Sequence, residues 1–310
     1  MRNRWPACTI LVAALVLSCA WQTALAIGAL TGTETATPRP LFVVGVPAPL
    51  LDSVQRAIVE RFGLAALDES VRADDAQALD DATGKGVRTV IALGRDACAA
   101  MMAVRPDRRT LCALLYADAF DALDCGDGCE HVEAIVMDQP PERQARVATR
   151  LFPALERFGV LRETAFASTV PGIESRTFDP RRRLSTQITD LLVFVDALIV
   201  EPRAGLYPPR NLRTVLLAAY GRDGPIIGYG PDWVRAGALV SAWSTPADVL
   251  GDVRDILGIE LGADAPPPAR MHPPSRFHVA ENPAVARSLG LRRRPFDIED
   301  RPFTDRDFLP

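Results

Sequence analysis

The residue types that most often carry out catalysis are sparse in this chain and form no known catalytic pattern. The sequence lacks a G-x-S-x-G nucleophile elbow, a Walker loop, a G-x-G-x-x-G turn after its first strand and an H-E-x-x-H zinc motif. Its three histidines are His131, His272 and His278, and isolated histidines are more often surface or structural residues than bases or ligands. Carboxylates are plentiful, but their spacing nominates no acid–base pair. We therefore predict a protein that is not an enzyme and uses no cofactor.

The cysteines offer either disulfides or a metal site. Cys125 and Cys129 flank a Gly-Asp-Gly loop that is pliable enough to be closed by a disulfide. With Cys98 and Cys112 they allow two disulfides and three connectivities in an oxidising compartment. The alternative is a metal site in which His131 joins Cys125 and Cys129, but a fourth ligand is not in view. We predict structural disulfides and no metal, and leave the pairing open.

The N-terminus has the three-part order of a secretory signal peptide. Arg2 and Arg4 precede an apolar run over residues 7–20, and the small-x-small tripeptide 24–26 follows. The run spans 14 residues, fewer than the roughly 20 that a transmembrane helix requires. The pattern predicts a signal peptide over residues 1–26 and a protein exported to the periplasm.

Two alternatives for the leader stay open. Residues 16–19 (VLSC) are similar to a bacterial lipobox, which would make Cys19 a lipid-carrying N-terminus. An uncleaved anchor is the other alternative. The leader therefore predicts export, with either release or lipid anchoring.

Composition and charge restrict the class of partner. The chain is 48% hydrophobic and 24% charged, as is usual for globular proteins, and after the leader it has no apolar run of 18 residues. Its formal charge is −4, and loss of the two leader arginines brings it to about −6, which gives no general attraction for phosphate backbones. We therefore exclude nucleic acid as a partner and expect a monomer.

Short apolar runs alternate with amphipathic helical patterns along the chain. The first run, residues 41–46 (LFVVGV), is typical of a strand buried on both faces of a parallel sheet. Such alternation indicates βαβ units with right-handed crossovers. Strands are predicted near 87–93, 110–115, 134–137, 158–162, 175–178, 197–200, 225–229, 238–243 and 277–280. Helices are predicted near 50–62, 75–83, 96–104, 142–151, 182–194, 212–220, 247–257 and 283–289.

The pattern predicts two α/β domains, each with a Rossmann-like parallel sheet. A Pro140-Pro141 break and a proline-rich stretch at 265–274 mark extended connections between them. The expected organisation begins with a signal peptide over residues 1–26 and a flexible spacer over residues 27–40, and it ends with a poorly ordered tail over residues 292–310.

In open α/β sheets, ligands bind at the carboxyl ends of the strands, where backbone groups and helix N-termini converge. Six such ends can be read, at 47–49, 94–96, 116–118, 162–163, 201–203 and 229–230. The alternative for the arginines among them is pairing with nearby carboxylates, and for the tyrosines a place at the rim of the core. The residues predicted to bind a ligand are Gly94, Arg95, Asp96, Tyr116, Asp118, Arg203 and Tyr229.

Several segments, taken in order, resemble the substrate-binding proteins of ABC importers, in particular the subfamily that includes aromatic amino acid binders. The resemblance covers about residues 41–291. It rests on TVIALG (89–94), MDQPPERQ (137–144), FGVL (158–161), DALIV (196–200), PIIGY (225–229), VRAGA (234–238) and NPAVARSLGL (282–291).

The resemblance implies a type I periplasmic binding fold, in which two α/β domains joined by a hinge of crossing strands close on a small ligand, and an ABC permease at the inner membrane as partner. It also implies that the chain returns to the first domain after the second sheet, so that the first domain comprises residues 41–138 with 246–275 and the second comprises residues 139–245 with 276–291. Asp118 matches the acidic residue after the fourth strand. The chain departs from the family at Gly94-Arg95, where a polar Ser or Thr is usual, at Glu201-Pro202, where an Asp is usual, and in the shortened region 162–172.

These patterns lead to two functional hypotheses. The first is a periplasmic solute-binding component of an ABC-type import system, which binds a small molecule in the cleft between its domains. The second is a degenerate binding fold that serves as a sensory or protein-interaction module. A receptor captured by the ligand-free protein would favour the second, and a monomer that changes radius with a metabolite would favour the first.

Overall fold

The computed structural model describes residues 40–83, 87, 89–104, 108–123, 130–163, 171–260, 271–298 and 301–309. The expected signal peptide and nearly all of the spacer, including Cys19, lie outside these residues. So do Cys125 and Cys129, with the disulfide and metal alternatives that involve them. Within the described residues, no helix combines the length and the apolar character that crossing a bilayer would require.

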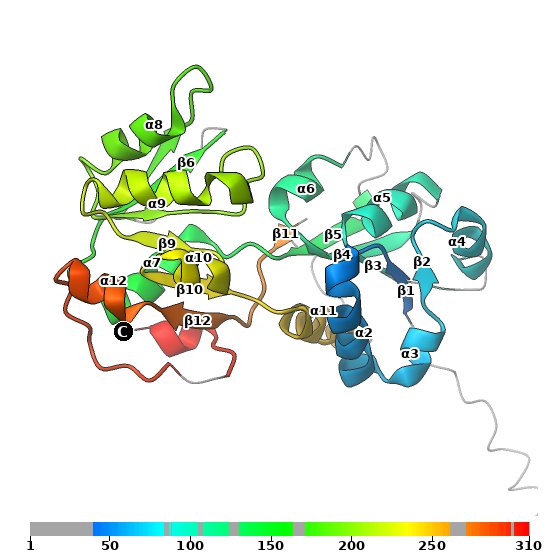
Figure 1. Cartoon of the computed structure of the whole chain (residues 1–310). Coiled ribbons are helices and arrows are strands. Elements are labelled where there is room, and N and C mark those ends of the chain that lie inside the picture. Colours follow the sequence, from blue (N-terminus) through cyan, green and yellow to red (C-terminus); the bar gives the residue numbers. More distant parts are fainter. Residues whose placement is uncertain are drawn as a thin grey trace, which may run out of the picture. The chain divides into compact units, whose positions relative to one another are not determined.

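The first of two six-stranded sheets is parallel throughout and has the order β11-β5-β4-β3-β1-β2 (Figure 1). Its strands are β1 (Leu41–Val44), β2 (Val71–Arg72), β3 (Thr89–Leu93), β4 (Arg109–Leu115), β5 (Val132–Val136) and β11 (Met271–His272). Helices cover both faces, which explains why the strands are continuous apolar runs. Along β1, Phe42 packs on one face, and Leu41 and Val43 pack on the other.

The helices of the first sheet divide between its faces. Core residues of α2 (Ala48–Phe62) and α11 (Pro246–Glu260) pack on one face. Core residues of α4 (Ala76–Thr83), α5 (Arg95–Val104) and α6 (Ala117–Asp121) pack on the other. A short helix, α3 (Leu64–Asp68), follows α2.

The second sheet has the order β12-β10-β9-β8-β6-β7, and only β12 runs antiparallel to its neighbour. Its strands are β6 (Phe158–Arg162), β7 (Ile173–Thr177), β8 (Ala197–Ile199), β9 (Ile226–Gly228), β10 (Val240–Trp243) and β12 (His278–Glu281). Two mostly parallel sheets, each between helical layers, confirm the predicted α/β class with two Rossmann-like sheets.

Helices also cover both faces of the second sheet. Side chains of α7 (Pro141–Leu151), α12 (Pro283–Ser288) and the 3-10 helix η3 (Asp305–Phe308) pack on one face. Those of α8 (Leu184–Leu191), α9 (Leu212–Tyr220) and α10 (Pro231–Ala236) pack on the other, with the 3-10 turn η2 (Pro209–Asn211) leading into α9.

The chain passes between the two sheets three times. The crossing segments, as we call them, are residues 137–140 after β5, residues 244–245 after β10 and residues 273–277 after β11. Each begins at the end of a strand, so the positions where the chain leaves one sheet coincide with strand ends.

Cys98 on α5 and Cys112 on β4 form a disulfide with a Cα–Cα distance of 5.6 Å, and both are fully buried. The expectation of a structural disulfide is confirmed for this pair. It joins a helix to the sheet beneath it, inside the core of the first sheet.

The C-terminal segment, residues 301–309, is folded against the second sheet, contrary to prediction. Phe303 and Phe308 are buried in the core of the second sheet, and Phe303 pairs with Phe277 through two backbone hydrogen bonds. The expectation of a poorly ordered tail is therefore wrong for residues 301–309. The prediction relied on the many charged residues of this tail and overlooked Phe303 and Phe308, which lie among them.

Candidate functional site

A cavity of about 350 Å³ lies where four parallel strands end. Tyr116 follows β4, Met137 follows β5, Tyr229 follows β9, and Trp243 closes β10. The first two belong to the first sheet and the others to the second. The cavity therefore occupies the location that open α/β sheets use for ligands.

Five of the twelve residues that line this cavity, which we call the aromatic pocket, are aromatic: three tyrosines and two tryptophans. The other seven are a methionine, a leucine, two prolines, a glycine, an aspartate and a serine. Such walls offer large apolar contact areas with polar tips. The lining residues are Tyr116, Met137, Tyr207, Pro209, Leu212, Tyr229, Gly230, Pro231, Asp232, Trp233, Trp243 and Ser244.

Tyr207 contributes a buried hydroxyl that has no partner among the described residues. The residue is only 2% exposed, and its hydroxyl makes no hydrogen bond there. Burial raises the pKa of this phenol well above its ordinary value, so it stays a neutral hydrogen-bond donor. An unpaired buried hydroxyl is costly, and in a pocket wall it is a candidate contact for a bound molecule.

Trp243 is held in place by its neighbours. Its ring stacks on the imidazole of His278 with centroids 5.9 Å apart, and His278 Nε2 lies 3.1 Å from a carboxylate oxygen of Asp248. Burial opposes ionisation of Asp248, but contacts with His278 and Thr245 outweigh it and lower the pKa of that carboxyl. The His278 imidazole, held by Asp248, therefore keeps the ring of Trp243 in position.

A buried ion pair supports the second-sheet side of the site. The guanidinium of Arg162, at the end of β6, forms two hydrogen bonds with the carboxylate of Glu201, which is 3% exposed. Arg203 lies 3.9 Å from the same carboxylate, and its Nε has no partner among the described residues. The charge of Glu201 is thus balanced by arginines within its own half of the molecule.

Asp138, in the first crossing segment, is a buried carboxylate that sequence reasoning missed. One of its oxygens accepts a hydrogen bond of 2.7 Å from the backbone N–H of Ala117, and the other has no partner among the described residues. Burial raises the pKa of Asp138 to about 6, and the Ala117 N–H and the charge of Arg203 only partly oppose that rise.

The residues predicted after β3 lie apart from the aromatic pocket. Gly94 has φ +92°, and a Cβ there would lie 2.5 Å from the carbonyl oxygen of Gly45, so this glycine serves a close turn. Arg95 and Asp96 are exposed on the first turn of α5, and Asp96 lines a separate hollow of about 220 Å³ beside β1 and β2.

The other predicted residues are divided between the pocket and its surroundings. Tyr116 and Tyr229 both line the aromatic pocket. Asp118 accepts a hydrogen bond of 3.1 Å from the backbone N–H of Ala204, which connects α6 of the first sheet to the loop after β8. Arg203 lies near Glu201, as the pairing alternative expected. Ligand contact at these positions stays a prediction.

Sequence reasoning missed the two strand ends from which the chain crosses between the sheets. Met137 follows β5, Trp243 is the last residue of β10 and Ser244 follows it, yet both strands were predicted. Counting every predicted parallel strand would have included these ends. Tyr207 carries no such signal, because it lies eight residues beyond β8 in a loop without periodicity.

A second cavity, of about 550 Å³, lies beside α7 and the C-terminal segment. Its charged lining is mixed, with Arg146, Arg150 and Arg294 beside Glu142 and Glu156, so no single ligand charge is favoured. In the parts of the chain that the structure describes, no group of three or more His, Cys, Asp or Glu could hold a metal ion.

Comparison of sequences gives no relative: no protein-family model and no curated protein matches the chain. Comparison of structures does give similar folds. A substrate-binding protein with adhesive properties from Clostridium difficile, in its ligand-free open form, matches with a TM-score of 0.57 and 13% identity over 84% of this chain and 96% of that one. The chain has the fold of the type I periplasmic binding proteins.

A second structure is similar over almost the same length. An ABC domain in complex with L-Trp from Streptococcus pneumonia covers 83% of this chain and 96% of its own, with 16% identity and a TM-score of 0.46. The similarity to the substrate-binding protein from Clostridium difficile accords with the predicted resemblance. At 13% identity this similarity concerns the fold.

Proposed function

We propose that this chain is the solute-binding component of an ABC-type import system, exported to the periplasm, and that it binds a small molecule in the aromatic pocket. The observation that carries the proposal is the position of that pocket: residues from the carboxyl ends of strands in both sheets line one cavity. Its volume of about 350 Å³ suits a metabolite-sized ligand.

The lining suggests how a solute would be bound. Tyr229 and Trp243 would stack against its apolar part, since both rings are only partly covered. The unpaired hydroxyl of Tyr207 would give directional selection, because a ligand acceptor there removes the cost of an unsatisfied donor. Binding, rather than reaction, is what this set of groups supports.

Both sheets would take part in binding. Tyr116 and Met137 come from the first sheet and face the same cavity as the second-sheet aromatics. A solute that contacts both would favour one relative arrangement of the sheets over others, which is the population shift that a hinged binder uses. The favoured arrangement would then be presented to a permease at the inner membrane.

The proposal is tested by ligand screening on the purified protein. Thermal shift against amino acids, purines and small carboxylates is followed by calorimetry on each compound that stabilises the fold. We expect at least one specific binder. A Trp243→Ala variant should bind it about 10- to 100-fold more weakly, because a central aromatic contact is lost.

Arg95→Ala is the matched control, since Arg95 is exposed at a first-sheet strand end and does not line the pocket. Its affinity should equal that of the unmodified protein. A binder lost in Arg95→Ala but retained in Trp243→Ala would move the site to the end of β3. The absence of any binder would contradict solute transport.

A further inference from the structure

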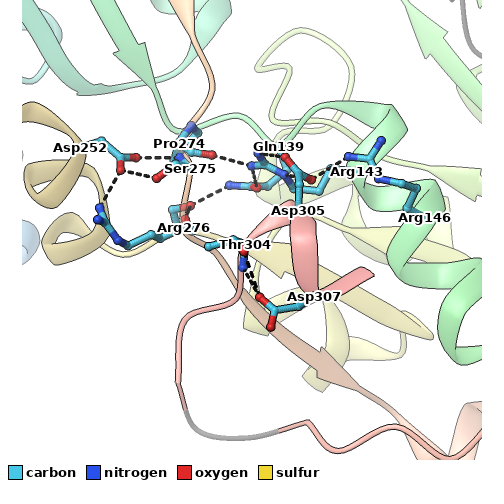
Figure 2. Close-up of polar contacts among 11 residues, drawn as sticks. Gln139, Arg143, Arg146, Asp252, Pro274, Ser275, Arg276, Thr304, Asp305 and Asp307 are labelled. Carbon is cyan, nitrogen blue, oxygen red and sulfur yellow. Dashed lines mark hydrogen bonds and ion pairs between the residues drawn. The ribbon is translucent and has the colours of Figure 1, made fainter. Parts of the chain in front are cut away.

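Arg143, on the first turn of α7, is a buried cation in contact with two of the three crossing segments. Its side chain is 4% exposed. Its Nη1 donates to the side-chain oxygen of Gln139 at 2.8 Å and to the backbone oxygen of Pro274 at 2.7 Å, and the guanidinium lies over the ring of Phe277. Figure 2 shows Gln139 and Pro274 beside Arg143.

The remaining crossing segment, residues 244–245, is reached through Gln139. The side-chain nitrogen of Gln139 donates to the hydroxyl of Ser244 at 2.9 Å, and that hydroxyl donates to the backbone oxygen of Arg276 at 2.5 Å. Ser244 also lines the aromatic pocket. A continuous path of hydrogen bonds therefore joins Arg143 to a wall of the pocket.

The carboxylate that balances Arg143 comes from the far end of the chain. Asp305 in η3 accepts from Nε and Nη2 of Arg143 at 3.0 and 2.8 Å, and from Arg146 at 2.7 Å (Figure 2). Burial alone would raise the pKa of Asp305, but contacts with the two arginines outweigh it and keep the pKa low. A bidentate charged pair of this kind stabilises the guanidinium of Arg143 and also fixes its orientation.

The C-terminal segment also contacts the crossing segment 273–277 directly. The backbone groups of Phe303 and Phe277 exchange hydrogen bonds of 2.9 and 2.6 Å. On its other side the same crossing segment is tied to α11, where Asp252 accepts from Ser275 and Arg276 (Figure 2). The C-terminal segment thus contacts the crossing segments both through Arg143 and through the backbone.

We propose that Asp305 is a positioning residue for the aromatic pocket, which acts through Arg143 and Gln139 to hold Ser244 and the crossing segments in one conformation. The inference rests on the proposed function for its consequence, because a loosened pocket wall would weaken solute binding. The loss of positioning itself is independent of any solute. In this role the C-terminal segment holds the crossing segments in place.

Hydrogen exchange of the ligand-free protein, followed by mass spectrometry, tests the proposal. In Asp305→Asn the charge that fixes Arg143 is lost, so we expect exchange in residues 137–139 and 244–245 to accelerate about tenfold. Asp305→Glu keeps the charge and should restore most of the protection. Asp307→Asn is the matched control, because Asp307 lies in the same 3-10 helix, accepts a hydrogen bond from the backbone N–H of its N-cap residue Thr304, and pairs with Arg301.

Asp307→Asn should accelerate exchange only within residues 301–309. Equal acceleration of the crossing segments by Asp305→Asn and Asp307→Asn would overturn the proposal, since it would reflect general loosening of the segment. If Asp305→Asn does not fold, the same connection is tested from the other end with Ser244→Ala. That variant should accelerate exchange in residues 303–308, and unchanged protection there would also overturn the proposal.

Because these measurements use no solute, they separate the two ideas. A ligand screen without a binder would contradict the proposed function, and hydrogen exchange would still decide the role of Asp305. Where a binder is found, Asp305→Asn should weaken it several-fold, whereas Asp307→Asn should leave its affinity unchanged.

Discussion

The carboxyl edges of the two sheets are built differently. At the edge of the first sheet, the turn at Gly94 leads to the exposed Arg95 and Asp96, and among the described residues of this edge only Tyr116 and Met137 line the aromatic pocket. The second sheet and its loops supply the remaining walls of the pocket and carry the buried Glu201 with its arginines.

The two sheets therefore contribute unequally to the lining of the aromatic pocket. Most of the lining of the aromatic pocket belongs to the second sheet and its loops, where the buried Glu201 pairs with Arg162 and lies near Arg203. The other sheet adds a small number of groups at the same location. A solute could therefore bind first to the second sheet and then select the arrangement in which Tyr116 and Met137 also touch it.

Breaking the charge balance of the second sheet should have the largest effect on stability. Glu201→Ala leaves Arg162 and Arg203 without their carboxylate in a buried location, which should lower the free energy of unfolding by about 3–5 kcal/mol. Urea denaturation followed by circular dichroism measures it. The counterpart in the first sheet is Glu133→Ala, which breaks a half-exposed pair with Arg109 and should cost about 1 kcal/mol or less.

Equal losses in the two variants would remove the contrast between the sheets. A small loss of stability in Glu201→Ala would mean that water reaches Arg162 and Arg203 and compensates for the missing carboxylate.

Removing the disulfide should affect the first sheet selectively. The double variant Cys98→Ala, Cys112→Ala opens a loop with a sequence separation of 14 residues, and the expected loss is about 3 kcal/mol. Hydrogen exchange should show reduced protection in β3, β4 and α5, with β8, β9 and β10 unchanged. Equal loss of protection in both sheets would contradict independent stabilisation.

The smallest of the three effects is a pH dependence from Asp138. Because the pKa of this carboxyl is raised to about 6 in the folded protein, the folded state binds its proton more tightly than the unfolded state. Stability attributable to Asp138 therefore falls as pH rises from about 4 to about 6 and stays low above that. Asp138→Asn should remove this slope and gain about 2 kcal/mol at pH 7.

Asp196→Asn is the opposite case for the same urea titrations. Burial opposes ionisation of Asp196, but its bonds with Arg157 and the N–H of Glu156 outweigh it and lower its pKa. That variant should be less stable at pH 7, and the difference should disappear as pH falls through the lowered pKa. A stability gain in Asp138→Asn that did not change with pH would mean that burial is not the cause.

Much of the architecture follows from the periodicity of the sequence. Strands buried on both faces, such as residues 158–162, are continuous apolar runs, and helix 212–220 has a clear apolar stripe, so both were predicted with the bounds that the structure has. Short elements such as β2 (Val71–Arg72) and α10 (Pro231–Ala236) were missed, because they are too brief for periodicity to show.

The site could be predicted only where a residue directly follows a strand. Tyr116 and Tyr229 were found by that rule, whereas Tyr207 sits in an irregular loop and is placed by tertiary packing. The role of Asp305 was equally hidden. Its partner Arg143 is distant in sequence, and only the fold brings the buried cation and the terminal carboxylate together.

Native mass spectrometry tests the central claim, solute binding in the aromatic pocket, most directly. The protein and its Trp243→Ala variant are each incubated with a dialysed fraction of small molecules from cell extract and sprayed without denaturation. The account predicts a noncovalent adduct of one small molecule per chain that is lost or strongly reduced in Trp243→Ala. A bare chain in the unmodified protein, or an adduct equally abundant in the variant, would contradict it.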